Sequence, residues 1–161
     1  GGPTFHIYLQ AYPERSLPQT VTVERPVVGG TETILVVEDE KDLRDLVAEL
    51  LLSFGYTVLQ AEDGAEGLEI YAQHRSEIRA VITDMGLPRL SGQDLFTRIK
   101  EMNPSARVIL ASGYLEAGLK SRLFIAGAKG FIQKPYQPHE VLRVLREVID
   151  IPEHQTQSPT P

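Results

Sequence analysis

The sequence contains no cysteine, which excludes disulfide bonds, thiolate nucleophiles and cysteine metal ligands. No run approaches the roughly 20 apolar residues that a membrane-spanning helix needs, and the first residues lack the layout of a signal peptide. Basic residues are also in the minority, since 16 Lys and Arg stand against 22 Asp and Glu for a net charge of −6. Without a basic face to neutralise phosphates, we expect no nucleic-acid partner, and we expect no membrane contact by this chain.

The 161 residues suit one domain with tails. Residues 11–32 carry Pro13, Pro18 and Pro26 followed by Gly29 and Gly30, which is the composition of a linker, although the valines within 20–28 also suit a short strand. Residues 33–150 form the periodic part of the chain. Residues 151–161 have the polar, proline-containing composition of a disordered tail.

Between residues 33 and 150, short apolar runs alternate with amphipathic segments. Five strands are predicted: one that begins at Thr33, one at 56–61, one that ends at Asp84, one at 106–111 and one at 129–133. The predicted helices cover 41–54, 63–75, 91–102, 115–126 and 138–150. Strands that alternate with helices form parallel sheets through right-handed crossovers, with helices on both faces. The predicted fold is therefore α/β, a five-stranded parallel doubly wound (flavodoxin-like) sheet with (βα)5 order.

Polar residues stand where four of these strands end. They are Glu38 and Asp39, Asp84, Ser112 and Lys134. Because the carboxyl ends of parallel strands lie at one edge of the sheet, we expect these side chains to converge. Each also has a structural interpretation: Asp39 is placed to cap the helix that follows it, as Asp63 is for the next helix, Ser112 suits a turn, and Lys134 suits an exposed strand end.

Three converging carboxylates repel one another, by about 4 kcal/mol for a pair about 4 Å apart at a protein surface. A raised pKa or a bound divalent cation relieves this repulsion. An all-oxygen ligand set favours a hard ion such as Mg²⁺. Lys134 and Ser112 add donors for an anion at the same edge, so the residues predict a phosphoryl-transfer site.

The segments VVEDE, TDMGLPRLSG, ILASG and FIQKPY occur in this order across 33–150, and with them the chain resembles the receiver domains of two-component response regulators. The resemblance implies that Asp84 is the phosphoacceptor and attacks a phosphohistidine. It also implies that Mg²⁺ is held by Asp84, by Asp39 directly, by Glu38 mainly through water, and by the backbone carbonyl of Gly86. Lys134 would pair with the phosphoryl oxygens.

The same resemblance implies a conformational switch, in which Ser112 turns inward to the phosphoryl group and Phe131 swings with it. Ser112 stands where threonine is more usual and Phe131 where tyrosine is frequent. Gly86 and Tyr114 occupy positions that tune phosphoryl lifetime in this family. The peptide bond from Lys134 to Pro135 is expected to be cis.

Residues 1–10, GGPTFHIYLQ, resemble the final strand of a histidine-kinase ATPase domain. Joined by the linker to a receiver, they imply the C-terminal receiver of a hybrid sensor histidine kinase. The implied partners are a histidine-kinase core or a histidine phosphotransfer protein. The implied location is cytoplasmic, whether or not the parent kinase is membrane-anchored, and the oligomeric state is left open.

Two other functions stay open. A Mg²⁺-dependent aspartate-nucleophile phosphohydrolase also uses a strand-end Asp and a Lys, but such enzymes commonly carry a second Asp where this chain has Gly86. A degenerate receiver could serve only for docking, against which the complete set of acids, hydroxyl and lysine argues. The HExxR sequence at His139 resembles a kinase phosphorylation box but opens an amphipathic helix directly after a proline, so we interpret it as coincidental.

Overall fold

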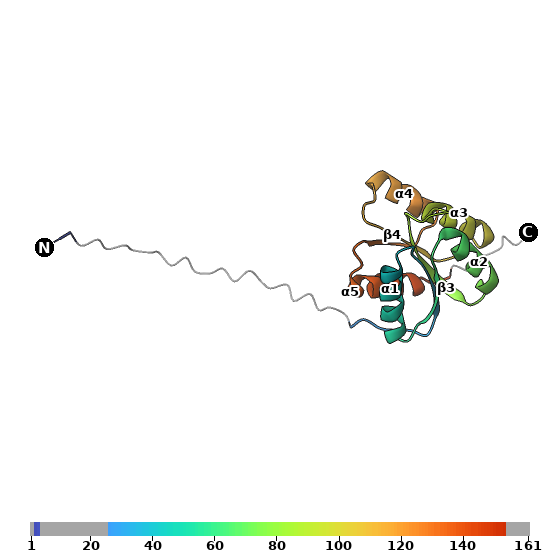
Figure 1. The fold of residues 1–161 in the computed structure, drawn as a ribbon, viewed down its shortest axis with the longest axis horizontal. Coiled ribbons are helices and arrows are strands. Elements are labelled where there is room, and N and C mark those ends of the chain that lie inside the picture. Colours follow the sequence, from blue (N-terminus) through green and yellow to red (C-terminus); the bar gives the residue numbers. More distant parts are fainter. Residues whose placement is uncertain (1, 4–25, 154–161) are drawn as a thin grey trace, which may run out of the picture.

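The computed structural model describes residues 2–3 and 26–153 (Figure 1). The predicted kinase-derived strand at 1–10, most of the predicted linker at 11–32 and most of the tail at 151–161 lie outside the described residues. Residues 26–32 contain no helix or strand, so the part of the alternative 20–28 strand that is described does not form.

Five strands and five helices alternate along the described chain. They are β1 Thr33–Val37, α1 Lys41–Ser53, β2 Thr57–Ala61, α2 Gly64–His74, β3 Ile78–Asp84, α3 Gly92–Met102, β4 Val108–Ser112, α4 Ala117–Ile125, β5 Gly130–Gln133 and α5 Pro138–Ile149. All strands are parallel, in the order β2-β1-β3-β4-β5. The predicted doubly wound (βα)5 fold is confirmed, with element ends displaced by only one or two residues.

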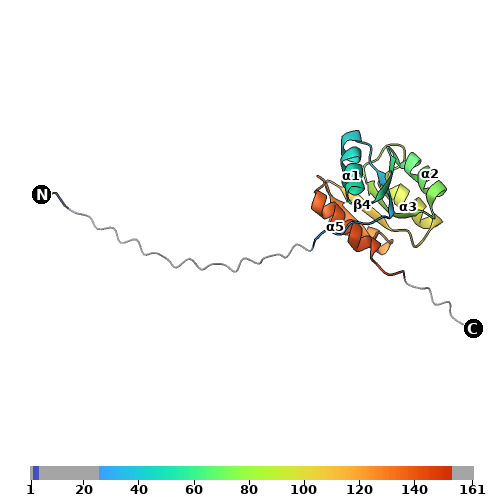
Figure 2. The ribbon, with the colours of Figure 1, turned by 90° about the horizontal axis from the view of Figure 1, so that it is seen from below.

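The two faces of the sheet are covered by different helices, with α1 and α5 on one face and α2, α3 and α4 on the other (Figures 1 and 2). Alternate residues of β1 show why its sequence is a continuous apolar run: Ile34 and Val36 join the first core, and Leu35 and Val37 join the second. The buried residues of α5 are all apolar: Val141, Leu142, Val144, Leu145, Val148 and Ile149. Helices therefore cover both faces of the sheet, and reactive side chains can be presented only at the strand ends.

The helix caps follow the sequence in one case and not in another. Asp63 caps α2 as predicted, because its side chain accepts a hydrogen bond of 2.9 Å from the backbone N–H of Glu66. The prediction that Asp39 caps α1 is wrong. Because α1 begins only at Lys41, its N-cap is Glu40. The side chain of Glu40 makes no capping hydrogen bond. Asp39 therefore lies outside the helix and is exposed at the sheet edge.

The loop after β3 folds tightly back onto the end of that strand. The backbone N–H of Gly92 donates a hydrogen bond of 3.1 Å to the carbonyl oxygen of Met85. A Cβ atom at position 92 would lie 2.0 Å from the carbonyl oxygen of Asp84. Glycine is thus required for this close approach, which holds the backbone of Asp84 in place.

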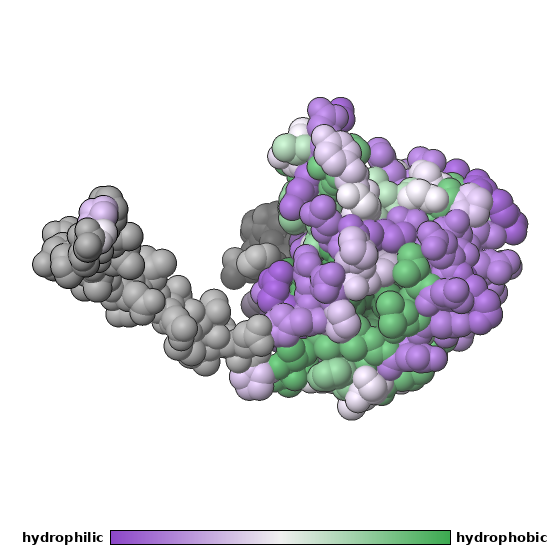
Figure 3. Space-filling model, turned by 60° about the vertical axis from the view of Figure 1, so that its left-hand side comes forward, coloured by the Kyte–Doolittle hydropathy of each residue, from purple (hydrophilic) through white to green (hydrophobic). Residues whose placement is uncertain are grey.

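The surface seen in Figure 3 is mostly hydrophilic, with an apolar area in the lower part of the view. Between α1 and α5 runs a groove lined mainly by apolar residues, among them Leu46, Leu50, Pro138 and Val141. No helix within the described residues is long and apolar enough to cross a membrane.

Candidate functional site

Side chains from three strand ends meet at one edge of the sheet. Glu38 follows β1, Asp84 is the last residue of β3, and Lys134 follows β5. The Nζ atom of Lys134 lies 3.1 Å from Oε2 of Glu38 and 3.4 Å from Oδ2 of Asp84. The convergence expected from the parallel topology is therefore present, with the lysine reaching past β4 to the two carboxylates.

Asp39 joins these two acids to form a possible metal site. One carboxylate oxygen from each of Glu38, Asp39 and Asp84 lies within 4.8 Å of the others. Glu38 is fully buried, Asp84 is 8% exposed and Asp39 is exposed, so the cluster has a closed floor and an open side. Three negative charges face a single lysine. An oxygen-only donor set with excess negative charge fits a hard divalent cation such as Mg²⁺.

Glu38 forms the buried end of the acidic cluster, and its surroundings shift its pKa. Burial raises the pKa of Glu38 and the nearby Asp84 charge adds to the effect, while hydrogen bonds from Lys134 and Tyr136 oppose it. Burial lowers the pKa of Lys134, but the hydrogen bond to Glu38 and the charges of both acids outweigh it, so the net shift is upward. Lys134 consequently stays charged and available to a second anion.

Tyr136 is a site residue that the sequence reasoning missed. It is buried, and its hydroxyl donates a hydrogen bond of 2.9 Å to Oε2 of Glu38. Burial, together with the acids of the site, raises the pKa of Tyr136, which keeps the hydroxyl protonated as a donor. The available signal was its place two residues after Lys134, at the end of the FIQKPY segment.

Ser112 is at the predicted strand end, and its hydroxyl is hydrogen-bonded to the backbone of Tyr114. It donates a hydrogen bond of 2.7 Å to the carbonyl oxygen of Tyr114 and accepts one of 3.3 Å from the backbone N–H of the same residue. Tyr114 is 83% exposed. Ser112 therefore has the turn-forming role that the sequence also allowed for it, and its hydroxyl is bonded to a residue only two positions away.

Phe131 lies in β5 and is partly buried. Its ring meets the ring of Phe124 from α4 edge to face, with centroids 4.7 Å apart, and Lys120 Nζ lies 5.4 Å from its centroid. The Phe131 side chain is thus packed against α4, and Phe131 itself lies in β5, the strand that Lys134 follows.

Three further positions named from the sequence are accounted for. A Cβ atom at Gly86 would have Oδ2 of Asp84 as its nearest neighbour, at 3.8 Å, so position 86 adjoins the carboxylate. The Lys134–Pro135 bond is cis, as predicted. His139 is exposed in the first turn of α5, and Arg143 of the HExxR sequence forms an ion pair with Glu147.

Comparison with known proteins gives matches over the same part of the chain. The family model described as "Response regulator receiver domain" matches residues 34–146. The chemotaxis protein CheY of Bacillus subtilis is 30% identical over 118 residues, which are 73% of this chain and 97% of that protein. The crystal structure of the CheX-CheY-BeF3-Mg²⁺ complex from Borrelia burgdorferi matches with a TM-score of 0.70 and 30% identity, covering 73% of this chain and 88% of that one.

A longer match extends beyond this region. The sensor kinase CckA of Brucella abortus is 30% identical over an alignment 157 residues long, and this alignment covers 92% of this chain. The chain spans only 17% of the length of that kinase.

Proposed function

Because this chain belongs to the response regulator receiver domain family, whose members are phosphoacceptor signalling domains of two-component systems, we propose that Asp84 is the residue that accepts the phosphoryl group. One observation carries the assignment. Asp84 ends the central strand 3.4 Å from Lys134 Nζ and shares an acidic cluster with Glu38 and Asp39. It is also slightly exposed, so a partner can reach it, whereas Glu38 is fully buried.

The chemistry is a single displacement at phosphorus. A carboxylate oxygen of Asp84 attacks the phosphorus of a phosphohistidine, and an O–P bond forms as the P–N bond breaks. The electron pair of the broken bond stays on the imidazole nitrogen, which takes up a proton. Lys134 pairs with the phosphoryl oxygens and lowers the cost of the charge that gathers there.

We further propose that Glu38, Asp39, Asp84 and the backbone carbonyl of Gly86 hold Mg²⁺. Bound Mg²⁺ neutralises charge between the nucleophile and the incoming phosphoryl oxygens. Oε2 of Glu38 is already engaged by Lys134 and Tyr136, which supports a water-mediated role for Glu38 and direct roles for the two aspartates. The related Borrelia CheY structure, by its title, contains both Mg²⁺ and BeF3.

Phosphorylation is proposed to shift two side chains. The Ser112 hydroxyl leaves the backbone of Tyr114 and turns to the phosphoryl group, and Phe131 moves relative to Phe124. The surface formed by α4, β5 and α5 then changes for a partner, as a population shift between two states. Gly86 offers no side chain to position an attacking water, and with Tyr114 it is proposed to set the rate of self-dephosphorylation.

The origin of the chain is proposed to be a hybrid sensor histidine kinase. The match to the Brucella sensor kinase covers 92% of this chain and therefore extends beyond 34–146. This supports division into a kinase-derived strand at 1–10, a linker at 11–32, the receiver at 33–150 and a tail at 151–161. The phosphoryl donor or acceptor would then be a kinase core or a histidine phosphotransfer protein, working in the cytoplasm.

Labelling by acetyl phosphate with Mg²⁺, read by intact mass, tests the assignment. We expect one phosphoryl group on the wild-type chain, none on Asp84→Asn, none with EDTA, and normal labelling of Asp42→Asn, which removes an exposed acid of α1. Continuous turnover of a small phosphate ester would instead indicate a phosphohydrolase. Failure with both acetyl phosphate and a histidine-kinase donor would indicate a docking module.

A further inference from the structure

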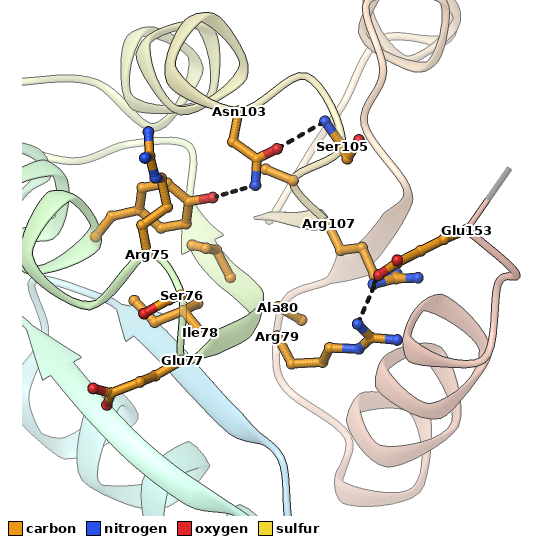
Figure 4. Close-up of a pocket in the computed structure, with 13 residues that line it drawn as sticks. Arg75, Ser76, Glu77, Ile78, Arg79, Ala80, Asn103, Ser105, Arg107 and Glu153 are labelled. Atoms are coloured by element: carbon orange, nitrogen blue, oxygen red, sulfur yellow. Dashed lines mark hydrogen bonds and ion pairs between the residues drawn. The ribbon is translucent and has the colours of Figure 1, made fainter. Parts of the chain in front are cut away.

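A second polar site lies at the opposite edge of the sheet from Asp84. It is a cavity of about 200 Å³ formed by the end of α2, the start of β3, the loop between α3 and β4, and the residues after α5 (Figure 4). Ile78 begins β3 and Asp84 ends it, so at a rise of about 3.3 Å per residue the two sites are about 20 Å apart. The cavity is therefore separate from the phosphoacceptor site.

Three arginines line this cavity, namely Arg75, Arg79 and Arg107, against two acids, Glu77 and Glu153. Arg107 is only 8% exposed, and one of its nitrogens donates a hydrogen bond of 2.8 Å to the carbonyl oxygen of Ile151. A buried guanidinium needs an anionic partner, because its charge has lost most of its water. The cavity thus contains the positively charged side chain of Arg107, which needs a negatively charged group beside it.

At present that negative charge comes from Glu153. One carboxylate oxygen, Oε1, accepts a hydrogen bond of 2.8 Å from Arg79 (Figure 4) and another of 3.4 Å from Arg107. The side chain of Glu153 is 67% exposed and belongs to the segment beyond the last helix. The pair of Glu153 with Arg79 is exposed and contributes little to stability, and Arg107 needs an anion but not this particular carboxylate, so Glu153 can be exchanged for another anion.

We propose that this cavity binds a phosphate-type oxyanion, which Arg79 and Arg107 hold in place of the Glu153 carboxylate. Two guanidinium groups that converge on one oxygen match a tetrahedral oxyanion, which presents several acceptor oxygens to their N–H groups. Ser76 and Ser105 also line the cavity and supply neutral donors. The volume is below the roughly 300 to 1,000 Å³ of pockets for drug-sized ligands, which favours inorganic phosphate or a small phosphomonoester.

Binding at this site has a consequence for the chain after α5. The oxyanion and Glu153 compete for the same two arginines, so occupation of the cavity releases the Glu153 segment from the sheet edge. By thermodynamic reciprocity, any interaction that draws this segment away strengthens anion binding.

The test is a titration of the 161-residue chain with inorganic phosphate, without Mg²⁺, followed by the NMR signals of the Arg79 and Arg107 Nε–H groups. Sodium chloride at the same ionic strength controls for screening, and glycerol phosphate replaces phosphate in a second arm. The variants are Glu153→Gln, Arg79→Gln and the matched control Arg98→Gln, which removes an exposed arginine of α3. Spectra of the free variants establish that each is folded.

We expect saturable shifts at both arginines. Glu153→Gln should tighten binding by up to about fivefold, as for removal of an exposed ion pair. Arg79→Gln should weaken it by about tenfold or more, as for loss of a hydrogen bond to a charged group, and Arg98→Gln should leave it unchanged. If glycerol phosphate binds as well, the site is assigned to phosphomonoesters. If only inorganic phosphate binds, the site is assigned to the free ion. Shifts that chloride reproduces, an absence of saturation, or equal affinity in Glu153→Gln would overturn the proposal.

Discussion

The hydroxyl of Tyr136 donates a hydrogen bond of 2.9 Å to Oε2 of Glu38, a residue 98 positions earlier in the chain. Lys134 bonds to the same oxygen. A fully buried carboxylate is therefore held by one neutral and one charged donor, which offsets part of the cost of burying its charge.

Replacing Tyr136 with Phe should lower the free energy of unfolding by about 1 to 3 kcal/mol, because a buried charged acceptor loses a donor while the ring stays in the core. Urea denaturation measures the change. Tyr114→Phe is the matched control, since its hydroxyl is exposed and its removal should alter stability by less than about 0.5 kcal/mol. Equal effects of the two substitutions would show that the hydrogen bond to Glu38 contributes nothing.

Asp39→Asn should stabilise the chain in the absence of Mg²⁺ and abolish stabilisation by Mg²⁺. The gain should be on the order of 1 kcal/mol, because the repulsion is relieved at an exposed position where water screens it. Thermal unfolding with and without Mg²⁺ measures both effects. Asp42→Asn should keep the full response to the ion; a similar loss of that response in both variants would contradict a specific site.

Arg146 should make stability depend on acid pH. It forms ion pairs with Glu32 at 2.9 Å and with Asp150 at 2.6 Å. The hydrogen bond from Arg146 lowers the pKa of Asp150; burial raises the pKa of Glu32, but the hydrogen bond and charge of Arg146 outweigh it and lower the pKa overall. The ordinary pKa values are 3.8 and 4.5, so the unfolded chain binds more protons as the pH falls through this range.

The contribution of these pairs is thus present above about pH 4.5 and is lost as the pH falls through the lowered pKa values. At neutral pH, Arg146→Gln should be less stable than the wild type by about 1 kcal/mol, a modest figure because both pairs are partly exposed. The difference should shrink toward zero in urea denaturation at more acidic pH. A difference that stays constant with pH would assign the effect to lost packing.

Two glycine substitutions should have opposite effects. At Gly92 a Cβ atom would lie 2.0 Å from the Asp84 carbonyl oxygen and 2.7 Å from the Met85 Cα, so Gly92→Ala should cost about 1 to 3 kcal/mol or more. Within α4, a Cβ atom at Gly118 has only Glu116 Oε1 near it, at 3.9 Å, so Gly118→Ala should stabilise by about 0.5 to 1 kcal/mol. Gly92→Ala should also slow labelling by acetyl phosphate, since it displaces the backbone of Asp84. A stabilising Gly92→Ala would contradict the observed loop packing.

The fold could be predicted from the sequence because both faces of the sheet are covered. That burial leaves apolar runs such as Ile34 to Val37 between amphipathic helices, and the alternation itself implies the parallel topology. The convergence of Glu38, Asp84 and Lys134 followed from the same topology, since strand ends share an edge whatever the side chains are.

Contacts made by side-chain rotamers could not be predicted in this way. The bond from Tyr136 to Glu38 depends on how the chain turns after the cis Lys134–Pro135 bond, which strand periodicity does not describe. Asp39 was wrongly predicted to cap α1. The helix begins at Lys41, one residue later than a cap at Asp39 would require, and this starting point depends on local backbone geometry. The local bond of the Ser112 hydroxyl to Tyr114 was likewise outside the reach of pattern analysis.

The bond between Lys134 and Glu38 closes a loop of 96 residues that contains most of the domain. Closing a long loop costs chain entropy before any contact compensates for it, so we expect this edge to form late in folding. Competence for phosphoryl transfer would then report on completion of the whole domain. In refolding experiments, labelling by acetyl phosphate should return with the slowest phase, and a partially folded chain that already contains α1 and β3 should not be labelled. A cell that reads the phosphorylated state would thereby read only chains that have finished folding.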